Sequence, residues 1–297
     1  MITNDYGSPS DGTAARAADC HAHVFGDQTY PYSPEATYIP HPSQAGTAAQ
    51  FRAVLDAHGL THGLLVGAGT YGSDNRCLLD AIASSGGRFK GIVLVKATVS
   101  QDELAGLADR GVVGIRINLV NHGLKPLIEP GADRLLAYLR EMGLFCQVQF
   151  QRDELLEAAP ILRKAGVRIM FDHFGRPAAE RGVSQPGFQE MLAFGREGHF
   201  VKLSGPFRAS AEGYPYLDVD PFIAAAIDAF TLGNCVWGSD WPFVRMDRRV
   251  DYGPTYSCLQ RWLPDPRDRQ RVLWDNPQRL FGFKEIRTKK LCTMDCL

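Results

Sequence analysis

Two histidines, His21 and His23, are separated by one residue in the apolar segment 18–25. In an extended strand alternate side chains share a face, so both imidazoles would point the same way. Such a pair suits a divalent metal or a polarised substrate oxygen. Two surface histidines near a terminus would show the same spacing, so the motif needs support from the rest of the chain.

Short apolar segments alternate with amphipathic ones along the chain. Strands are expected at 18–24, 62–68, 89–95, 112–119, 144–150, 167–171, 200–203 and 234–237. Helices are expected at 43–58, 74–85, 100–110, 132–142, 153–165, 186–198 and 221–232, with a last one starting near Asp265. Eight such repeats predict an α/β protein with a closed (β/α)8 TIM barrel, in one domain spanning 18–283. An open doubly wound sheet is the alternative, but no Gly-x-Gly-x-x-Gly turn follows the first strand.

Three segments are expected to lie outside this regular pattern. Residues 1–17 are small and polar and predict a flexible N-terminal arm. Residues 284–297 follow the predicted barrel and are expected to be a disordered tail. Four prolines between 31 and 42 exclude regular structure there, so we interpret 30–42 as a flap over the site.

Composition limits the partners. The 297 residues are 45% hydrophobic and 22% charged, with a net charge of −1. This balance favours neither nucleic acid nor membrane, so a small molecule is the expected partner of a monomer or small homo-oligomer. Seven cysteines without a Cys-x-x-Cys pair, and no signal-like or 18-residue apolar segment, predict a cytoplasmic protein.

Polar residues recur where the predicted strands end, which is where such barrels place their reacting groups. They are Arg116, Gln147, Gln149, His173, Arg176, Arg208 and Asp240, in addition to His21 and His23. So many chemically capable groups at one mouth are hard to explain by packing alone. Each also has a structural interpretation: His173 as a core histidine, Asp240 as a turn cap, and the arginines as ion pairs. Lys202 is expected to point into the barrel wall and is not ranked as catalytic.

These motifs together resemble the amidohydrolase superfamily. Asp-His-Phe-Gly-Arg-Pro at 172–177, Gly-Ser-Asp-Trp-Pro at 238–242 and Asp-Asn-Pro-Gln-Arg-Leu-Phe at 275–281 resemble its lactonase branch. The flap and the turn Gly-Ser-Asp-Asn at 72–75 most resemble the 2-pyrone-4,6-dicarboxylate lactonases. The similarity extends from about residue 19 to residue 283.

The resemblance implies hydrolysis of a small anionic lactone, carboxylated or sulfonated. Asp240 would activate water, and His21, His23 and His173 would polarise the carbonyl. The residues that it assigns to the substrate's anionic groups are Arg116, Arg176, Arg208 and Tyr38. Two further substrate contacts depart from the family pattern, because His122 stands where a second arginine is expected and Gln149 where a tyrosine is expected.

The resemblance leaves the metal open. The lactonases in question act without one, whereas a single zinc on His21, His23 and Asp240 is chemically reasonable. Arg116 and Asn118 occupy the fourth strand, where two-metal members carry lysine or glutamate, so a binuclear centre is not expected. No organic cofactor is expected. The alternative functions are a metal-dependent decarboxylase of the same superfamily and a non-catalytic anion-binding barrel.

Overall fold

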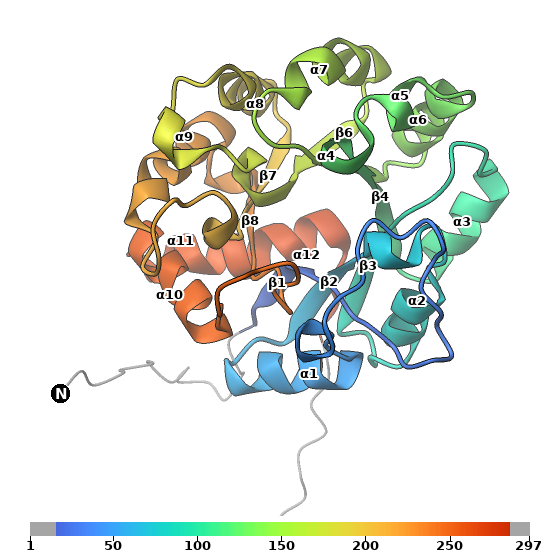
Figure 1. Cartoon of the computed structure of the whole chain (residues 1–297), viewed down its shortest axis with the longest axis horizontal. Helices are drawn as coiled ribbons and strands as arrows, with labels where there is room; N and C mark the ends of the chain where they lie inside the picture. Colours follow the sequence, from blue (N-terminus) through green and yellow to red (C-terminus); the bar gives the residue numbers. More distant parts are fainter. Residues whose placement is uncertain (1–15, 286–297) are drawn as a thin grey trace, which may run out of the picture.

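Eight parallel strands form the centre of the molecule in the computed structural model, which describes residues 16–285 (Figure 1). They follow one another around the sheet in sequence order. The strands are β1 (Ala18–Ala22), β2 (His62–Val66), β3 (Phe89–Val93), β4 (Val112–Asn118), β5 (Phe145–Gln149), β6 (Arg168–Phe171), β7 (Phe200–Ser204) and β8 (Cys235–Gly238). All eight predicted strands are therefore present, and the TIM-barrel prediction is confirmed.

Helices surround this sheet (Figure 1). They are α1 (Ala48–Ala57), α2 (Arg76–Ala83), α3 (Gln101–Asp109), α4 (Leu119–His122), α5 (Lys125–Ile128), α6 (Ala132–Glu141), α7 (Glu154–Ala165), α8 (Pro186–Arg196), α9 (Asp220–Phe230), α10 (Tyr252–Trp262), α11 (Pro266–Gln270) and α12 (Asn276–Phe281). A π-helical turn, Arg271–Asp275, joins the last two.

Four helices differ clearly from the sequence prediction, and two of them, the short α4 and α5 that follow β4, were not expected. α1 begins at Ala48 rather than at 43, because Thr47 and Gln50 form a capping box. The Thr47 hydroxyl accepts from the backbone amide of Gln50, and the side-chain oxygen of Gln50 accepts from the backbone amide of Thr47. α10 was not expected, since Gly253 and Pro254 near its start are typical of a turn. Proline is nevertheless tolerated in the first turn of a helix, where its missing N–H is not needed.

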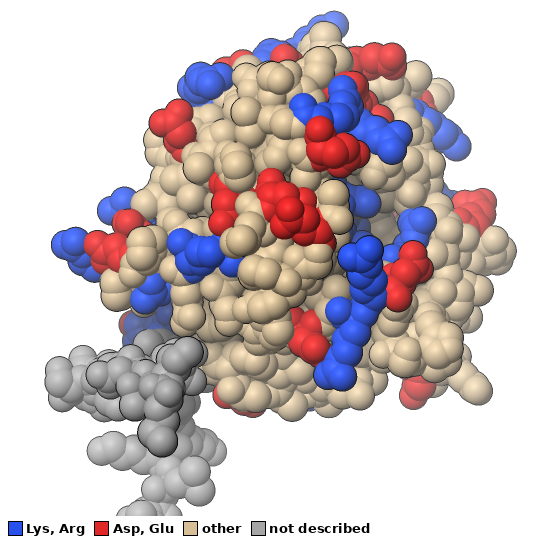
Figure 2. Space-filling model, turned by 60° about the vertical axis from the view of Figure 1, so that its left-hand side comes forward, with Lys and Arg blue, Asp and Glu red and all other residues tan. Residues whose placement is uncertain are grey.

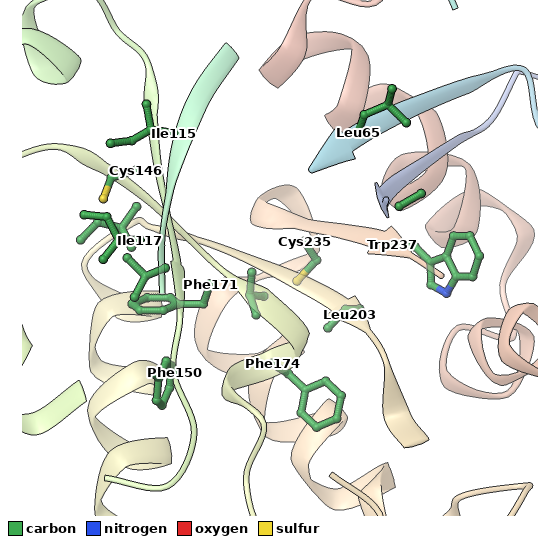
Figure 3. Packing of buried hydrophobic residues seen from close by; sticks show 14 of the residues in the cluster. Leu65, Ile115, Ile117, Cys146, Phe150, Phe171, Phe174, Leu203, Cys235 and Trp237 are labelled. Atoms are coloured by element: carbon green, nitrogen blue, oxygen red, sulfur yellow. The ribbon is translucent and has the colours of Figure 1, made fainter. Parts of the chain in front are cut away.

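The strands alternate between an outward and an inward face. Outward residues such as Ile115, Cys146 and Leu203 pack beneath the helices in one large apolar cluster (Figure 3). Inward residues near the start of the strands, among them Phe145, Met170 and Phe200, form a second cluster that fills the barrel. This filling leaves only the carboxyl ends of the strands for polar chemistry.

The barrel closes where β8 meets β1. The Asp240 amide donates to the His21 carbonyl at 2.8 Å, and the His23 amide donates to the Trp241 carbonyl at 2.8 Å. The chains approach so closely that a Cβ on Gly238 would lie 2.6 Å from that of His21, which explains the glycine there. Closure thus brings the first and last predicted catalytic segments side by side.

The predicted arm and tail fall largely outside the described residues, in 1–15 and 286–297. Within the described part, the Ala17 carbonyl accepts from the Thr61 amide at 2.8 Å, and Arg16 pairs with Glu285 at 2.6 Å. Among residues 16–285 we find no helix with the length and apolar character needed to cross a bilayer.

Candidate active site

The candidate catalytic residues lie at the carboxyl ends of three strands, and two of them sit on backbone turns. Asp240 follows β8 with a φ of 65°, and His173 follows β6 with a φ of 50°. Left-handed φ values cost energy in residues with a Cβ, and such strain clusters at functional sites. The strand register of β1 is irregular between Asp19 and Ala22, just where His21 is presented.

Three imidazoles surround one oxygen of Asp240. The Oδ1 atom lies 3.7 Å from His21 Nε2, 3.4 Å from His23 Nε2 and 3.8 Å from His173 Nε2. All four side chains are buried. The structure therefore brings together the four residues that the sequence predicts to be catalytic.

The other oxygen of Asp240 is held by Arg208, whose Nε donates to Oδ2. Burial alone would raise the pKa of this carboxyl, but the Arg208 guanidinium and the histidines hold it well below its usual range. Asp240 is consequently a carboxylate at neutral pH. Arg208 also donates to the Val244 carbonyl at 3.1 Å, so its main contacts are to the protein.

The other ring nitrogens of His23 and His173 are fixed by the surrounding chain. His23 Nδ1 lies 2.8 Å from the Val66 carbonyl oxygen, which only accepts, so Nδ1 carries a proton. His173 Nδ1 lies 2.9 Å from Ser204 Oγ. Burial lowers the pKa of His173 to about 3, which keeps this ring neutral. Gly205 permits the contact, because a Cβ there would lie 2.9 Å from His173 Nδ1.

A layer of buried charge lies directly beneath the histidines. Asp172 Oδ2 accepts from Arg116 Nε at 2.9 Å. Lys202 Nζ lies 2.6 Å from Gln147 Oε1, 3.4 Å from His21 Nδ1 and 3.8 Å from Asp172 Oδ1. Lys202 thus points into the barrel below His21, and not into the barrel wall as expected. Burial opposes the charge of Asp172, but His21, Arg116 and Lys202 hold the pKa of this carboxyl well below its usual range.

A cavity of about 230 Å³ opens above these groups. This is less than the 300–1,000 Å³ of pockets for drug-sized ligands, so the cavity suits a small substrate. Its lining contains eight of the predicted site residues, namely His23, Tyr38, Arg116, Gln149, His173, Arg176, Arg208 and Asp240. His21 lies just below the cavity, within 3.7 Å of Asp240.

One predicted substrate contact does not reach the cavity. His122 is exposed on α4, and its neighbour Asn121 lines the cavity instead. Asn121 donates to Thr37 at 3.2 Å, which ties α4 to the flap. The sequence prediction also missed Arg245, which lies over the Tyr38 ring at 5.5 Å. Its only sequence signal was a position five residues after Asp240.

Arginines give the cavity its positive charge. Arg176 has an unpaired buried donor, since its Nε has no hydrogen-bond partner within the described residues. Burial lowers its pKa to about 10, so the group stays charged at neutral pH. On the face shown in Figure 2 basic and acidic side chains are interspersed, whereas the cavity is lined by four arginines and one carboxylate, Asp240.

The donor set can be tested for a single divalent metal. Ligand atoms of His21, His173 and Asp240 lie within 4.8 Å of one another, a spacing that one ion could bridge. The buried His21 Nε2 has no hydrogen-bond partner among residues 16–285, which also fits a ligand role. The structure thus groups His173 with His21 and Asp240, where the sequence prediction named His23.

Known proteins are similar to this chain in both sequence and fold. The chain is 31% identical to a 2-pyrone-4,6-dicarboxylate hydrolase of Comamonas testosteroni over 92% of each chain. It is 32% identical to a 4-sulfomuconolactone hydrolase of Rhizobium radiobacter, over 92% of this chain and 96% of that one.

A solved structure agrees. A probable 2-pyrone-4,6-dicarboxylic acid hydrolase from Acinetobacter baumannii, with citric acid bound, superimposes with a TM-score of 0.81 at 29% identity. The match covers 90% of this chain and 99% of that one. The amidohydrolase family model matches residues 18–283, which is the whole barrel. The chain therefore belongs to the amidohydrolase family.

Proposed function

We propose that this protein is a lactonase, which hydrolyses the cyclic ester of a small anionic lactone. The observation that carries the proposal is a carboxylate, Asp240, whose Oδ1 is surrounded by three imidazoles at 3.4–3.8 Å beneath an arginine-lined cavity. The relatives named as lactone hydrolases support it, since they align over nine-tenths of the chain.

Arg176 is the anchor that we propose for the substrate's carboxylate or sulfonate. Its buried Nε has no hydrogen-bond partner among residues 16–285, whereas Arg208 is paired with Asp240 and Arg116 with Asp172. An anion that satisfies a buried guanidinium gains charge-assisted hydrogen bonds. The neighbouring strands β4 and β5 carry Asn118 and Gln149, which are register partners and line the same cavity. Their amides suit neutral hydroxyl or carbonyl groups of the lactone.

The reaction follows from the protonation states. Asp240 accepts a proton from a water molecule, and the water oxygen forms a bond to the lactone carbonyl carbon while the carbonyl π pair moves onto oxygen. The ring N–H groups of His21 and His173 stabilise this oxyanion, because the Nδ1 proton of His23 is held by the Val66 carbonyl. The oxyanion then collapses, the ring C–O bond breaks, and the leaving oxygen takes the proton from Asp240.

A single divalent metal would be held by His21, His173 and Asp240, and when bound it would supply Lewis-acid polarisation of the carbonyl. Zinc is the ion that we propose for this nitrogen and oxygen donor set. The protein residues still bind the anion, orient the ring and move the proton. We further propose a cytoplasmic location, since the five cysteines within 16–285 are buried free thiols.

The direct test is a ring-opening assay with a pH indicator. Purified protein is mixed with sugar lactones, muconolactones and pyrone carboxylates, each anionic lactone beside its neutral methyl ester. We expect proton release with at least one anionic lactone and little with its ester. Failure to open any lactone, together with tight binding of one, would support a non-catalytic anion-binding barrel instead.

The decarboxylase alternative is separated in the same assay. Release of CO2 that a chelator abolishes would favour it over lactone hydrolysis. Metal analysis of the same sample shows whether the ion is present during turnover.

A further inference from the structure

The four arginines that line the cavity differ in what holds them. Arg116 and Arg208 form ion pairs with carboxylates of the protein, and only 8% and 11% of their side chains are exposed. Arg176 is the anchor proposed above. Arg245 is exposed where the cavity meets solvent, and the described residues 16–285 place no carboxylate within ion-pair distance of its guanidinium. This cation is therefore available to an incoming anion.

The backbone of Arg245 is held firmly in the loop that follows β8. Its amide donates to Gln44 Oε1 at 3.2 Å, and Gln44 Nε2 donates to the Met246 carbonyl at 2.9 Å. Its φ is 61°, a left-handed value that costs energy in a residue with a Cβ and that is typical of functional sites. The preceding residue, Val244, also lines the cavity. The loop thus fixes the point from which the guanidinium reaches the entrance.

The side chain of Arg245 is held only loosely by comparison. Its Cζ lies 5.5 Å from the centroid of the Tyr38 ring, a cation–π contact that is weak at an exposed site. A carboxylate or sulfonate offers the guanidinium stronger, charge-assisted hydrogen bonds. The flap does not depend on this contact alone, because the Ser33 amide donates to the Thr70 carbonyl at 2.9 Å. An anion can therefore draw Arg245 away from Tyr38 while the flap stays in place.

The charge of Arg245 also acts inside the cavity. Burial is the main cause of the lowered pKa of Arg176, and the charge of Arg245 is among the smaller causes, so the two guanidiniums lie within electrostatic reach of each other. The lining holds one carboxylate, Asp240, which is paired with Arg208. A cleft lined by one sign of charge raises the rate at which a ligand of opposite charge enters.

We infer that Arg245 is a specificity-determining residue, which receives the anionic group of the lactone at the entrance of the cavity before that group reaches Arg176. It acts on substrate entry and not on proton transfer at Asp240. The inference rests on the proposed function and deepens it, because it assigns the preference for anionic over neutral lactones to a residue of the loop after β8.

The test compares Arg245→Met with the unmodified protein, using an anionic lactone that the ring-opening assay has identified and its neutral methyl ester. In about 10 mM salt, where the screening length is roughly 30 Å, kcat/KM for the anion should fall roughly 10-fold with kcat unchanged. In about 1 M salt, where that length is roughly 3 Å, the difference should disappear. Arg245→Lys keeps the charge and should retain most of the salt dependence.

Arg249→Met is the matched control. Arg249 lies in the same loop with 86% of its side chain exposed, but it is paired with Asp251 at 3.0 Å and does not line the cavity. Its loss should leave kcat/KM unchanged. An unchanged kcat/KM in folded Arg245→Met would overturn the inference. So would a fall in kcat, or an equal loss with the neutral ester, because either would show that Arg245 only supports the flap.

A binding measurement separates this inference from the proposed function, because it requires no turnover. Isophthalate, a dicarboxylate without an ester, is titrated into each protein by calorimetry in low salt, with its neutral diamide for comparison. We expect isophthalate to bind more weakly to Arg245→Met than to the unmodified protein and to Arg249→Met, even if no lactone is opened. Equal affinity in all three proteins, or no binding to any of them, would overturn the inference.

Discussion

The lower half of the barrel interior is apolar and the upper half is charged, and the change occurs within two residues along the chain. The inward residue changes from Phe145 to Gln147 on β5 and from Phe200 to Lys202 on β7, and from Met170 on β6 to Asp172 in the turn that follows it. Two residues of a strand span roughly 7 Å. The lower half is an apolar core, and the upper half is a network of buried charge. Stability and chemistry thus depend on different residues of the same strands.

Removal of the proposed base, Asp240, should have the largest effect on turnover and tests whether the upper half of the barrel carries the chemistry. Asp240→Asn should cut turnover by roughly 10²–10⁴, because the amide cannot accept the proton of water. Steady-state kinetics with an anionic lactone measure it, with the exposed Asp133→Asn on α6 as the control. Turnover close to that of the unmodified protein would remove Asp240 from the mechanism.

The second variant removes apolar volume from the lower half of the barrel and should affect stability rather than turnover. Met170→Ala should lower the free energy of unfolding by about 2–5 kcal/mol, since it leaves a cavity in the barrel core. Urea denaturation followed by circular dichroism measures it. The turnover of the folded fraction should stay unchanged, and a loss of turnover without a loss of stability would show that the two halves are coupled.

A variant of Arg176 separates substrate binding from proton transfer within the upper half of the barrel. Arg176→Met should raise KM for an anionic lactone roughly 10–100-fold, because a hydrogen bond to a charged group contributes about 1.5–3 kcal/mol. The neutral ester of the same lactone should be unaffected. Arg196→Met, at an exposed position on α8, is the control. An equal loss with both substrates would make Arg176 a structural residue.

The smallest predicted effect is on the pH dependence of stability. Burial lowers the pKa of His173 to about 3 and that of His62 to about 4, from an ordinary value of 6.5. Below pH 6.5 the unfolded chain therefore binds protons that the folded chain excludes, and stability falls as the pH drops towards 4. Asp19 acts in the opposite direction, since burial raises its pKa from 3.8 to about 6.

Scanning calorimetry between pH 4 and pH 7.5 measures this slope. We expect Tm to fall on acidification in the unmodified protein, and to fall less in His62→Phe, which lies at the other end of β2 from the site. A Tm that is independent of pH over this range would contradict the prediction.

Sequence reasoning found the strands, Asp240 and the three histidines around it, because strand ends and residue types are local properties. It could not place His122, whose side chain depends on the path of the short helix α4. It also could not show that Lys202 turns inward. The partners that make burial of this ammonium acceptable, Gln147 and Asp172, come from β5 and from the turn after β6, far away in the sequence.

The carboxylate of Asp19 has a consequence for how the protein is made. It accepts from the His21 amide at 3.1 Å, from the Ser239 amide at 2.9 Å and from the Tyr252 hydroxyl at 3.0 Å. These partners span most of the chain, so the seam between the first and last strands forms only after some 250 residues have been synthesised. A nascent polypeptide that still lacks its final quarter therefore has the three histidines but not Asp240. It can hydrolyse a lactone only after β8 has been synthesised and has paired with β1.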